Sequence, residues 1–141
     1  MTQPTVPVLD LAALEEKAVE VRLDILDSTT RAGSGHPSSS FSAVEVVLAL
    51  YFGGVLRYRP DDPHWPERDR FIMSKGHAAP LLYAALAHAG YFDRSELNRL
   101  RQVDSPVQGH PIQYMMPGVE ATTGSLGQGF RSVWAMCSAA V

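Results

Sequence analysis

The chain passes from a short apolar run into a helical pattern at Arg70-Phe71-Ile72-Met73-Ser74-Lys75-Gly76-His77-Ala78. An apolar run of this length beside a glycine is typical of a buried β-strand. In open α/β sheets, ligands bind at the carboxyl end of such a strand, where the amides of the following helix favour negative charge. The sequence therefore predicts an α/β protein that is mainly helical, with one clear parallel-sheet strand at about residues 70–74.

Apolar residues at helical spacing predict helices on both sides of this strand. Asp10 is expected to cap the first helix, and Ser42 and Glu45 have the spacing of a capping box for the second. The predicted helices span residues 10–33, 42–54, 78–89 and 93–101, and a last helix begins near residue 127. Residues 102–118 are predicted to form a long loop because three prolines interrupt them.

The composition fits a single folded domain. The chain has 141 residues, of which 45% are hydrophobic, and its formal net charge is −3. Residues 1–8 are predicted to be a flexible leader that precedes a domain at residues 9–141. The negative net charge provides no basic field for nucleic acid or for an anionic membrane surface, and no apolar run is long enough to be a membrane span. Cys137 is the only cysteine, which fits a cytoplasmic protein without disulfides.

Three of the five histidines directly follow a glycine, at Gly35-His36-Pro37, Gly76-His77-Ala78 and Gly109-His110-Pro111. Glycine lets the backbone and a ligand approach closely, and histidine provides a group that changes charge near neutral pH. Three such pairs in separate segments predict one polar pocket that is assembled from distant parts of the chain.

Two of these histidines also have a simpler interpretation. His77 can serve as a helix cap and His110 as a surface side chain. A zinc site made of His36, His77 and His110 is conceivable, although no short ligand spacing supports it. The two remaining histidines, His64 and His88, are expected to be structural or solvated.

A glycine-rich turn opens the predicted last helix, at Thr123-Gly124-Ser125-Leu126-Gly127-Gln128-Gly129. Backbone amides in such a turn can point at an anion, and the helix N-terminus attracts phosphate oxygens. The turn matches neither the dinucleotide fingerprint nor the P-loop, which needs a lysine after its last glycine. A plain flexible turn explains this segment equally well.

In their order, these motifs resemble the N-terminal region of transketolases, and most closely the N-terminal, diphosphate-binding subunit of transketolases that are split over two genes. The resemblance covers roughly residues 14–136. Four stretches carry it: Arg31-Ala32-Gly33-Ser34-Gly35-His36-Pro37, residues 65–78, Gln108-Gly109-His110-Pro111 and residues 117–129.

The resemblance implies an enzyme that binds thiamine diphosphate with a divalent metal, Mg²⁺ or Ca²⁺, and transfers two-carbon ketol units between sugar phosphates. It implies that His36 and His110 line the substrate channel, and that His77 lies where the cofactor diphosphate meets the substrate. The backbone of Gly124, Ser125 and Leu126 is implied to hold the aminopyrimidine and the diphosphate. All three histidines are therefore candidate catalytic residues, and His77 is also a candidate cofactor ligand.

The chain also departs from the family pattern. The Gly-Asp-Gly metal motif, a later metal-binding asparagine and the pyrimidine-binding domain are absent, so no metal ligand is expected here and the domain is an incomplete thiamine-diphosphate fold. In the last helix, Arg131, Trp134 and Ala135 replace smaller or aliphatic residues, and Ser38 replaces a glycine. We therefore expect a transferase subunit that is inactive alone and forms a hetero-oligomer with companion chains that carry the missing parts.

Two other functions remain open at this stage. The altered residues leave room for a specialised enzyme that transfers a two-carbon unit to a carrier protein or an unusual sugar. The chain can also be a non-catalytic interaction subunit that uses the apolar end of the last helix, from Trp134 to Val141, to bind a partner.

Overall fold

The first helix has the ends that the sequence predicts. The computed structural model describes residues 7–139, and its helix α1 spans Leu11–Ala32. The Asp10 side chain accepts a hydrogen bond of 2.9 Å from the Ala13 N–H at the N-terminus of α1. Gly33 ends the helix with a left-handed φ of 59°, a conformation that glycine adopts without steric cost.

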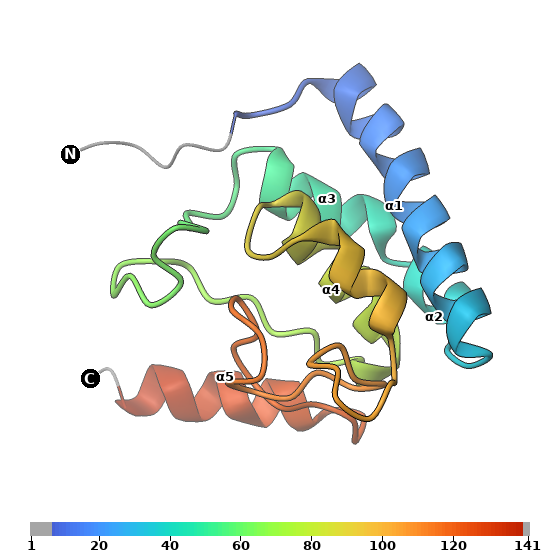
Figure 1. Cartoon of the computed structure of the whole chain (residues 1–141). Helices are drawn as coiled ribbons and strands as arrows, with labels where there is room; N and C mark the ends of the chain where they lie inside the picture. The colour runs from blue at the N-terminus through green and yellow to red at the C-terminus, as the bar shows by residue number, and fades with distance from the viewer. Residues whose placement is uncertain (1–6, 140–141) are drawn as a thin grey trace.

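Helices α1, α3 (Val44–Phe52) and α4 (Ala79–His88) pack against one another and form the core (Figure 1). Every residue of α4 from Ala79 to Ala87 is buried, and its many alanines let the neighbouring helices approach closely. The faces turned to α4 carry large side chains, including the fully buried Ile25 of α1 and Leu48 of α3. The core therefore depends on three helices that the sequence predicts.

The predicted capping box of the second helix is wrong. A short helix, α2 (Pro37–Phe41), replaces part of the expected loop, and α3 begins at Val44 without a side-chain cap. The Ser42 hydroxyl instead donates to the Ser39 carbonyl at 3.0 Å, and the Glu45 carboxylate pairs with Arg22 of α1. A local contact of Ser42 and a contact of Glu45 with α1 thus replace the predicted capping box.

The expected strand at residues 70–74 is not formed. No β-strand occurs between residues 7 and 139, and residues 70–73 cross the molecule as an irregular segment. A strand exists only when a neighbouring segment pairs with its backbone. Here the contact with the segment at residue 123 comes from a side chain, since the Thr123 hydroxyl donates to the Met73 carbonyl at 2.8 Å. A 3₁₀ turn, η1 (Gly76–Ala78), then leads into α4.

The C-terminal third of the described chain is mostly loop. After the 3₁₀ segment η2 (Arg94–Arg99), irregular chain runs as far as helix α5 (Gln128–Ala139). Figure 1 shows α5 beneath the loops and away from α1, and Gly129 is its one buried residue. No helix within the described residues is long and apolar enough to cross a membrane.

The predicted leader lies partly outside the described residues, which begin at residue 7. At its end, the Leu9 N–H donates to the Phe52 carbonyl at 2.8 Å, so the chain is tied to the end of α3 just before α1 begins.

Candidate functional site

The three glycine-linked histidines come together, as the sequence predicts. The rings of His36 and His77 have centroids 5.1 Å apart, and those of His77 and His110 have centroids 4.9 Å apart. Both pairs are edge-to-face, with interplanar angles of 85° and 81°. His77 is therefore the middle member of a row of imidazoles from three segments, which we call the histidine cluster. A catalytic role for the three residues stays a prediction.

Two glycines bring these segments into contact. A Cβ at Gly76 would lie 2.7 Å from the carbonyl oxygen of Thr123 and 2.8 Å from the Gly124 nitrogen, so only glycine fits between His77 and the glycine-rich turn. Gly35 has a φ of 135°, and a Cβ there would lie 2.6 Å from Cγ2 of Thr29 in α1. In these two pairs the glycine is therefore needed for close packing beside the histidine.

Helix α4 contacts the backbone of His110, and the pKa of the His110 imidazole is lowered. The Tyr83 hydroxyl donates to the His110 backbone carbonyl at 3.1 Å. Burial lowers the pKa of the His110 imidazole, and the nearby His77, Arg101 and His36 lower it further. This favours a neutral ring, which can accept a proton or a hydrogen bond at neutral pH.

The glycine-rich turn lies against this imidazole. A Cβ at Gly124 would be 3.4 Å from Cδ2 of His110. The turn is fixed at Thr123, whose N–H donates to the Pro111 carbonyl at 3.2 Å. Beyond it, the N–H groups of Gly124, Ser125 and Leu126 donate no hydrogen bond to any described residue. These amides therefore suit an anion such as the diphosphate of a cofactor.

The cluster does not resemble a metal centre. Within residues 7–139, no three histidine, cysteine, aspartate or glutamate side chains are arranged to hold a metal ion. The described structure therefore does not support a zinc site made of His36, His77 and His110, whose rings meet edge to face.

Two basic residues near the cluster have positions that sequence reasoning missed. Lys75 is bound internally, because its Nζ donates to the Ser39 carbonyl at 2.7 Å and to the Ser42 hydroxyl at 2.8 Å. Arg101 lies against Gly109, next to His110. Nothing in the local sequence around Arg101 indicates this contact, because a separate loop creates it.

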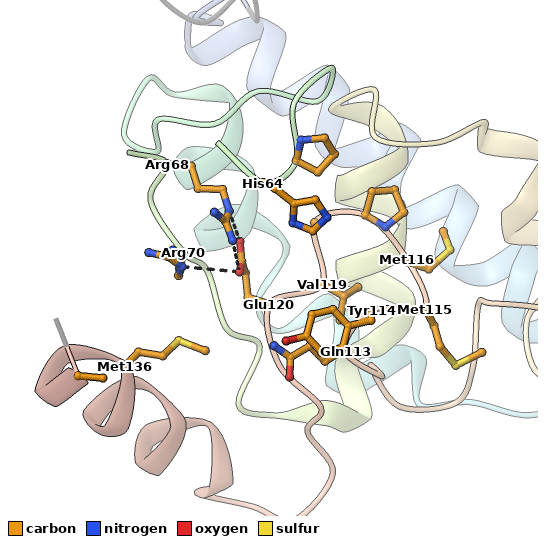
Figure 2. Close-up of a pocket in the computed structure, with 14 residues that line it drawn as sticks. His64, Arg68, Arg70, Gln113, Tyr114, Met115, Met116, Val119, Glu120 and Met136 are labelled. Carbon is orange, nitrogen blue, oxygen red and sulfur yellow. Dashed lines mark hydrogen bonds and ion pairs between the residues drawn. The ribbon is translucent and has the colours of Figure 1, made fainter. Parts of the chain in front are cut away.

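A second concave region was also missed. A pocket of about 830 Å³, here called the loop pocket, lies between residues 113–120, the segment around His64 and Arg68, and α5 (Figure 2). On its wall, Arg68 donates two hydrogen bonds to the Glu120 carboxylate, at 2.7 and 2.9 Å. Met136 faces the pocket from α5, while the exposed His64 contributes to the rim and none of the clustered histidines lines it.

Comparison with known proteins places this arrangement in a family. Residues 14–141 match the family described as the transketolase, thiamine diphosphate binding domain. Human transketolase is 44% identical over 126 residues, which cover 89% of this chain and 20% of the human protein. The transketolase of Treponema pallidum is 45% identical over 118 residues, covering 83% of this chain and 18% of that protein.

Solved structures show the same relationship. The transketolase from Leishmania mexicana superposes with a TM-score of 0.79 at 38% identity, covering 86% of this chain and 18% of that one. The transketolase from Campylobacter jejuni gives a TM-score of 0.77 at 36% identity, covering 86% and 19%. The chain thus spans about a fifth of the length of the relatives that it matches. It belongs to the transketolase family, in the part that forms the thiamine diphosphate binding domain.

Proposed function

We propose that this chain is the diphosphate-binding component of a transketolase-like transferase, which moves two-carbon ketol units between sugar phosphates. One observation carries the proposal: His77 contacts both other histidines, while the turn at Gly124 contacts His110. An anion held on the turn amides would therefore lie beside a row of proton-accepting groups. The family match at residues 14–141 supports the same activity.

The described residues fit thiamine diphosphate at its anionic end. The free N–H groups of Gly124, Ser125 and Leu126 would hold the diphosphate and aminopyrimidine. His77 would lie where the cofactor diphosphate meets the substrate, and His36 and His110 would hydrogen-bond the carbonyl and hydroxyl oxygens of the donor sugar. When bound, thiamine diphosphate supplies a thiazolium carbanion and an electron sink for the ketol transfer.

The remaining parts of the site are proposed to come from elsewhere. The Mg²⁺ or Ca²⁺ ligands and the pyrimidine-binding domain would lie on a companion chain or on another segment, in a cytoplasmic hetero-oligomer. The surface of α5 supports this, since Phe130 is 71% exposed and Trp134 is 69% exposed. An apolar helix face of this kind is stabilised when another surface covers it.

The same face favours a second candidate function, a non-catalytic interaction subunit. In that case α5 would be required for partner binding and the histidine cluster would be dispensable. A specialised enzyme that delivers the two-carbon unit to a carrier protein or an unusual sugar keeps the cluster and changes only the acceptor.

The decisive experiment combines cofactor titration with activity. We expect the purified 141-residue chain to show no micromolar binding of thiamine diphosphate with Mg²⁺ in isothermal titration calorimetry. Ketol transfer from a ketose phosphate should appear only when the companion chains that co-purify with it are present. Tight binding by the isolated chain would overturn the partner requirement.

Substitutions in the assembled enzyme then test the site. His77→Ala and His110→Ala should lower turnover far more than they lower thermal stability, because both imidazoles are partly accessible. His64→Ala is the matched control, since His64 is exposed and lies outside the cluster. Full activity in both cluster variants, with partner binding lost in Trp134→Ala, would favour the interaction subunit instead.

A further inference from the structure

Arg101 has an unusual backbone conformation for its residue type. Its φ is 63°, in the left-handed region that non-glycine residues rarely adopt. The Arg101 N–H donates to the Val107 carbonyl at 2.8 Å, which closes the loop between the two residues. A strained conformation that is fixed by a hydrogen bond in this way persists when the surrounding structure requires it, and such positions gather at functional sites.

The left-handed conformation of Arg101 places its guanidinium against Gly109. A Cβ at Gly109 would lie 3.1 Å from Nη1 of Arg101, 3.2 Å from Cζ and 3.4 Å from Nε. The planar group therefore lies on the backbone of Gly109, directly before His110. No hydrogen bond or ion pair joins this guanidinium to a carboxylate among the described residues, so its charge is not cancelled locally.

The charged and titratable groups around His110 come from four segments. They are Arg101, His77 of η1, His36 before α2, and Tyr83 of α4, whose hydroxyl meets the His110 carbonyl. Of these, Arg101, His77 and His36 act electrostatically on the imidazole, and each of them is either neutral or positive. Arg101 differs from the two histidines because it stays positive at every physiological pH.

We propose that Arg101 is a positioning residue for His110: its left-handed turn holds the guanidinium on Gly109, where a fixed positive charge stands beside the His110 imidazole. Burial is the largest cause that lowers the His110 pKa and His77 is the next, and the exposed Arg101 adds a charge in the same direction that does not titrate with the cluster. The benefit to ketol transfer rests on the proposed function, because an uncharged imidazole can accept a proton from the substrate. The protonation state itself is a property of the chain alone.

The test is a histidine titration by proton NMR on the 141-residue chain. The His110 signal is assigned by its loss in His110→Asn. Arg101→Asn removes the charge with a residue that tolerates the left-handed region, and Arg101→Lys retains the charge. We expect the His110 pKa to rise in Arg101→Asn and to stay near the wild-type value in Arg101→Lys. Equal midpoints in the wild type and Arg101→Asn would overturn the proposal.

Two further readouts keep the result unambiguous. The signal of His88, the last residue of α4, whose side chain contacts α1, should not move in either variant. In the wild-type chain, about 1 M salt should also raise the His110 pKa, because it shortens the screening length to about 3 Å. This measurement needs no substitution at Arg101, so it holds even if Arg101→Asn folds poorly. No salt response would count against Arg101.

In the assembled enzyme, Arg101→Asn should move the acid limb of the kcat/KM profile to higher pH. The loss of kcat/KM should grow as the pH is lowered and disappear at high pH, whereas a merely structural role would lower activity at every pH. Absence of ketol transfer in the wild type would contradict the proposed function and leave the titration result standing. An unshifted acid limb in an active enzyme would contradict the role of Arg101.

Discussion

Helices α4 and α5 are both apolar and rich in small residues, yet they have opposite environments. In α4, Ala79 to Ala87 are all buried among α1, α2 and α3. In α5, Gly129 alone is buried, and Trp134 remains 69% exposed. The described chain therefore covers α4 and leaves α5 largely exposed. Apolar composition does not by itself show whether the same chain covers a helix.

The largest expected difference between the two helices concerns stability. Leu86→Ala in α4 removes a fully buried side chain and should lower the free energy of unfolding by about 2–5 kcal/mol, because a cavity remains. Trp134→Ala in α5 removes a larger side chain but should change the free energy of unfolding by less than about 0.5 kcal/mol, because that side chain is exposed. Urea unfolding of the isolated chain measures both values.

The same pair of variants shows whether α5 is free in solution. A cost of more than about 2 kcal/mol for Trp134→Ala, a typical value for a buried large side chain, would mean that α5 is packed in solution. With companion chains present, Trp134→Ala should instead weaken assembly, while Leu86→Ala should act mainly through unfolding.

The second prediction compares a mostly buried ion pair with an exposed one. Arg68 and Glu120, on the wall of the loop pocket, have side chains 11% and 13% exposed. Arg68→Ala should cost about 1–3 kcal/mol, less than a fully buried pair, because it leaves the Glu120 carboxylate without its two donors. Arg31→Ala breaks the pair with Asp27 on the surface of α1, at 59% and 63% exposure, and should cost about 0–1 kcal/mol. Thermal unfolding of both variants measures the contrast, and equal costs would contradict it.

The features that sequence analysis predicted correctly depend on local chemistry. Asp10 caps α1 and Gly33 ends it because each acts within one helical turn. The meeting of the three histidines could be predicted because each carries its own glycine. The strand and the capping box failed for the opposite reason, since strand pairing and the contacts of Ser42 depend on distant segments. The position of Arg101 likewise becomes visible only when Gly109 is beside it.

The third prediction concerns the point where α5 joins the rest of the molecule. A Cβ at Gly129 would lie 2.6 Å from Cβ and 2.7 Å from Cα of Ser74, so Gly129→Ala must push the two segments apart. Such overpacking costs about 1–3 kcal/mol, and the better helix propensity of alanine offsets about 1 kcal/mol of it. Amide hydrogen exchange should show α5 opening more readily than in the wild type.

A second substitution checks the cause of this effect. Ser74→Gly removes two of the three atoms that crowd the new methyl group, Cβ and Oγ. In combination with Gly129→Ala it should restore part of the protection of α5. If Ser74→Gly does not restore any of the amide protection of α5, Gly129 and Ser74 are not in contact.

The smallest expected effect lies on the other side of the core, at the end of α4. His88 has a side chain only 6% exposed, and its Nε2 is 2.8 Å from an Asp24 carboxylate oxygen. Lys17 lies 3.4 Å from Nδ1 and Glu20 lies 3.7 Å from it, while Arg94 pairs with Asp24 from the η2 side. Burial lowers the pKa of His88 more than the hydrogen bond with Asp24 raises it, and the charges of Lys17 and Arg94 lower it further.

Because the pKa of His88 is lowered in the folded chain, the protein should lose stability as the pH falls. As the pH falls through about 6.5, the ordinary histidine value, the unfolded chain binds a proton at His88 before the folded chain does. The free energy of unfolding should therefore fall between about pH 7.5 and about pH 5.5, a range above the carboxylate pKa values. His110 contributes with the same sign, because its pKa is also lowered.

Variants separate the two histidines. His88→Gln keeps a donor for Asp24 but cannot titrate, so its melting temperature should depend less on pH than that of the wild type. His110→Asn should remove its own share in the same way, and the double variant should depend on pH less than either single variant. An unchanged pH dependence in His88→Gln would show that Asp24 compensates fully for burial. The loss of stability in acid would then arise at His110, which is partly exposed in the histidine cluster, and not at the buried His88.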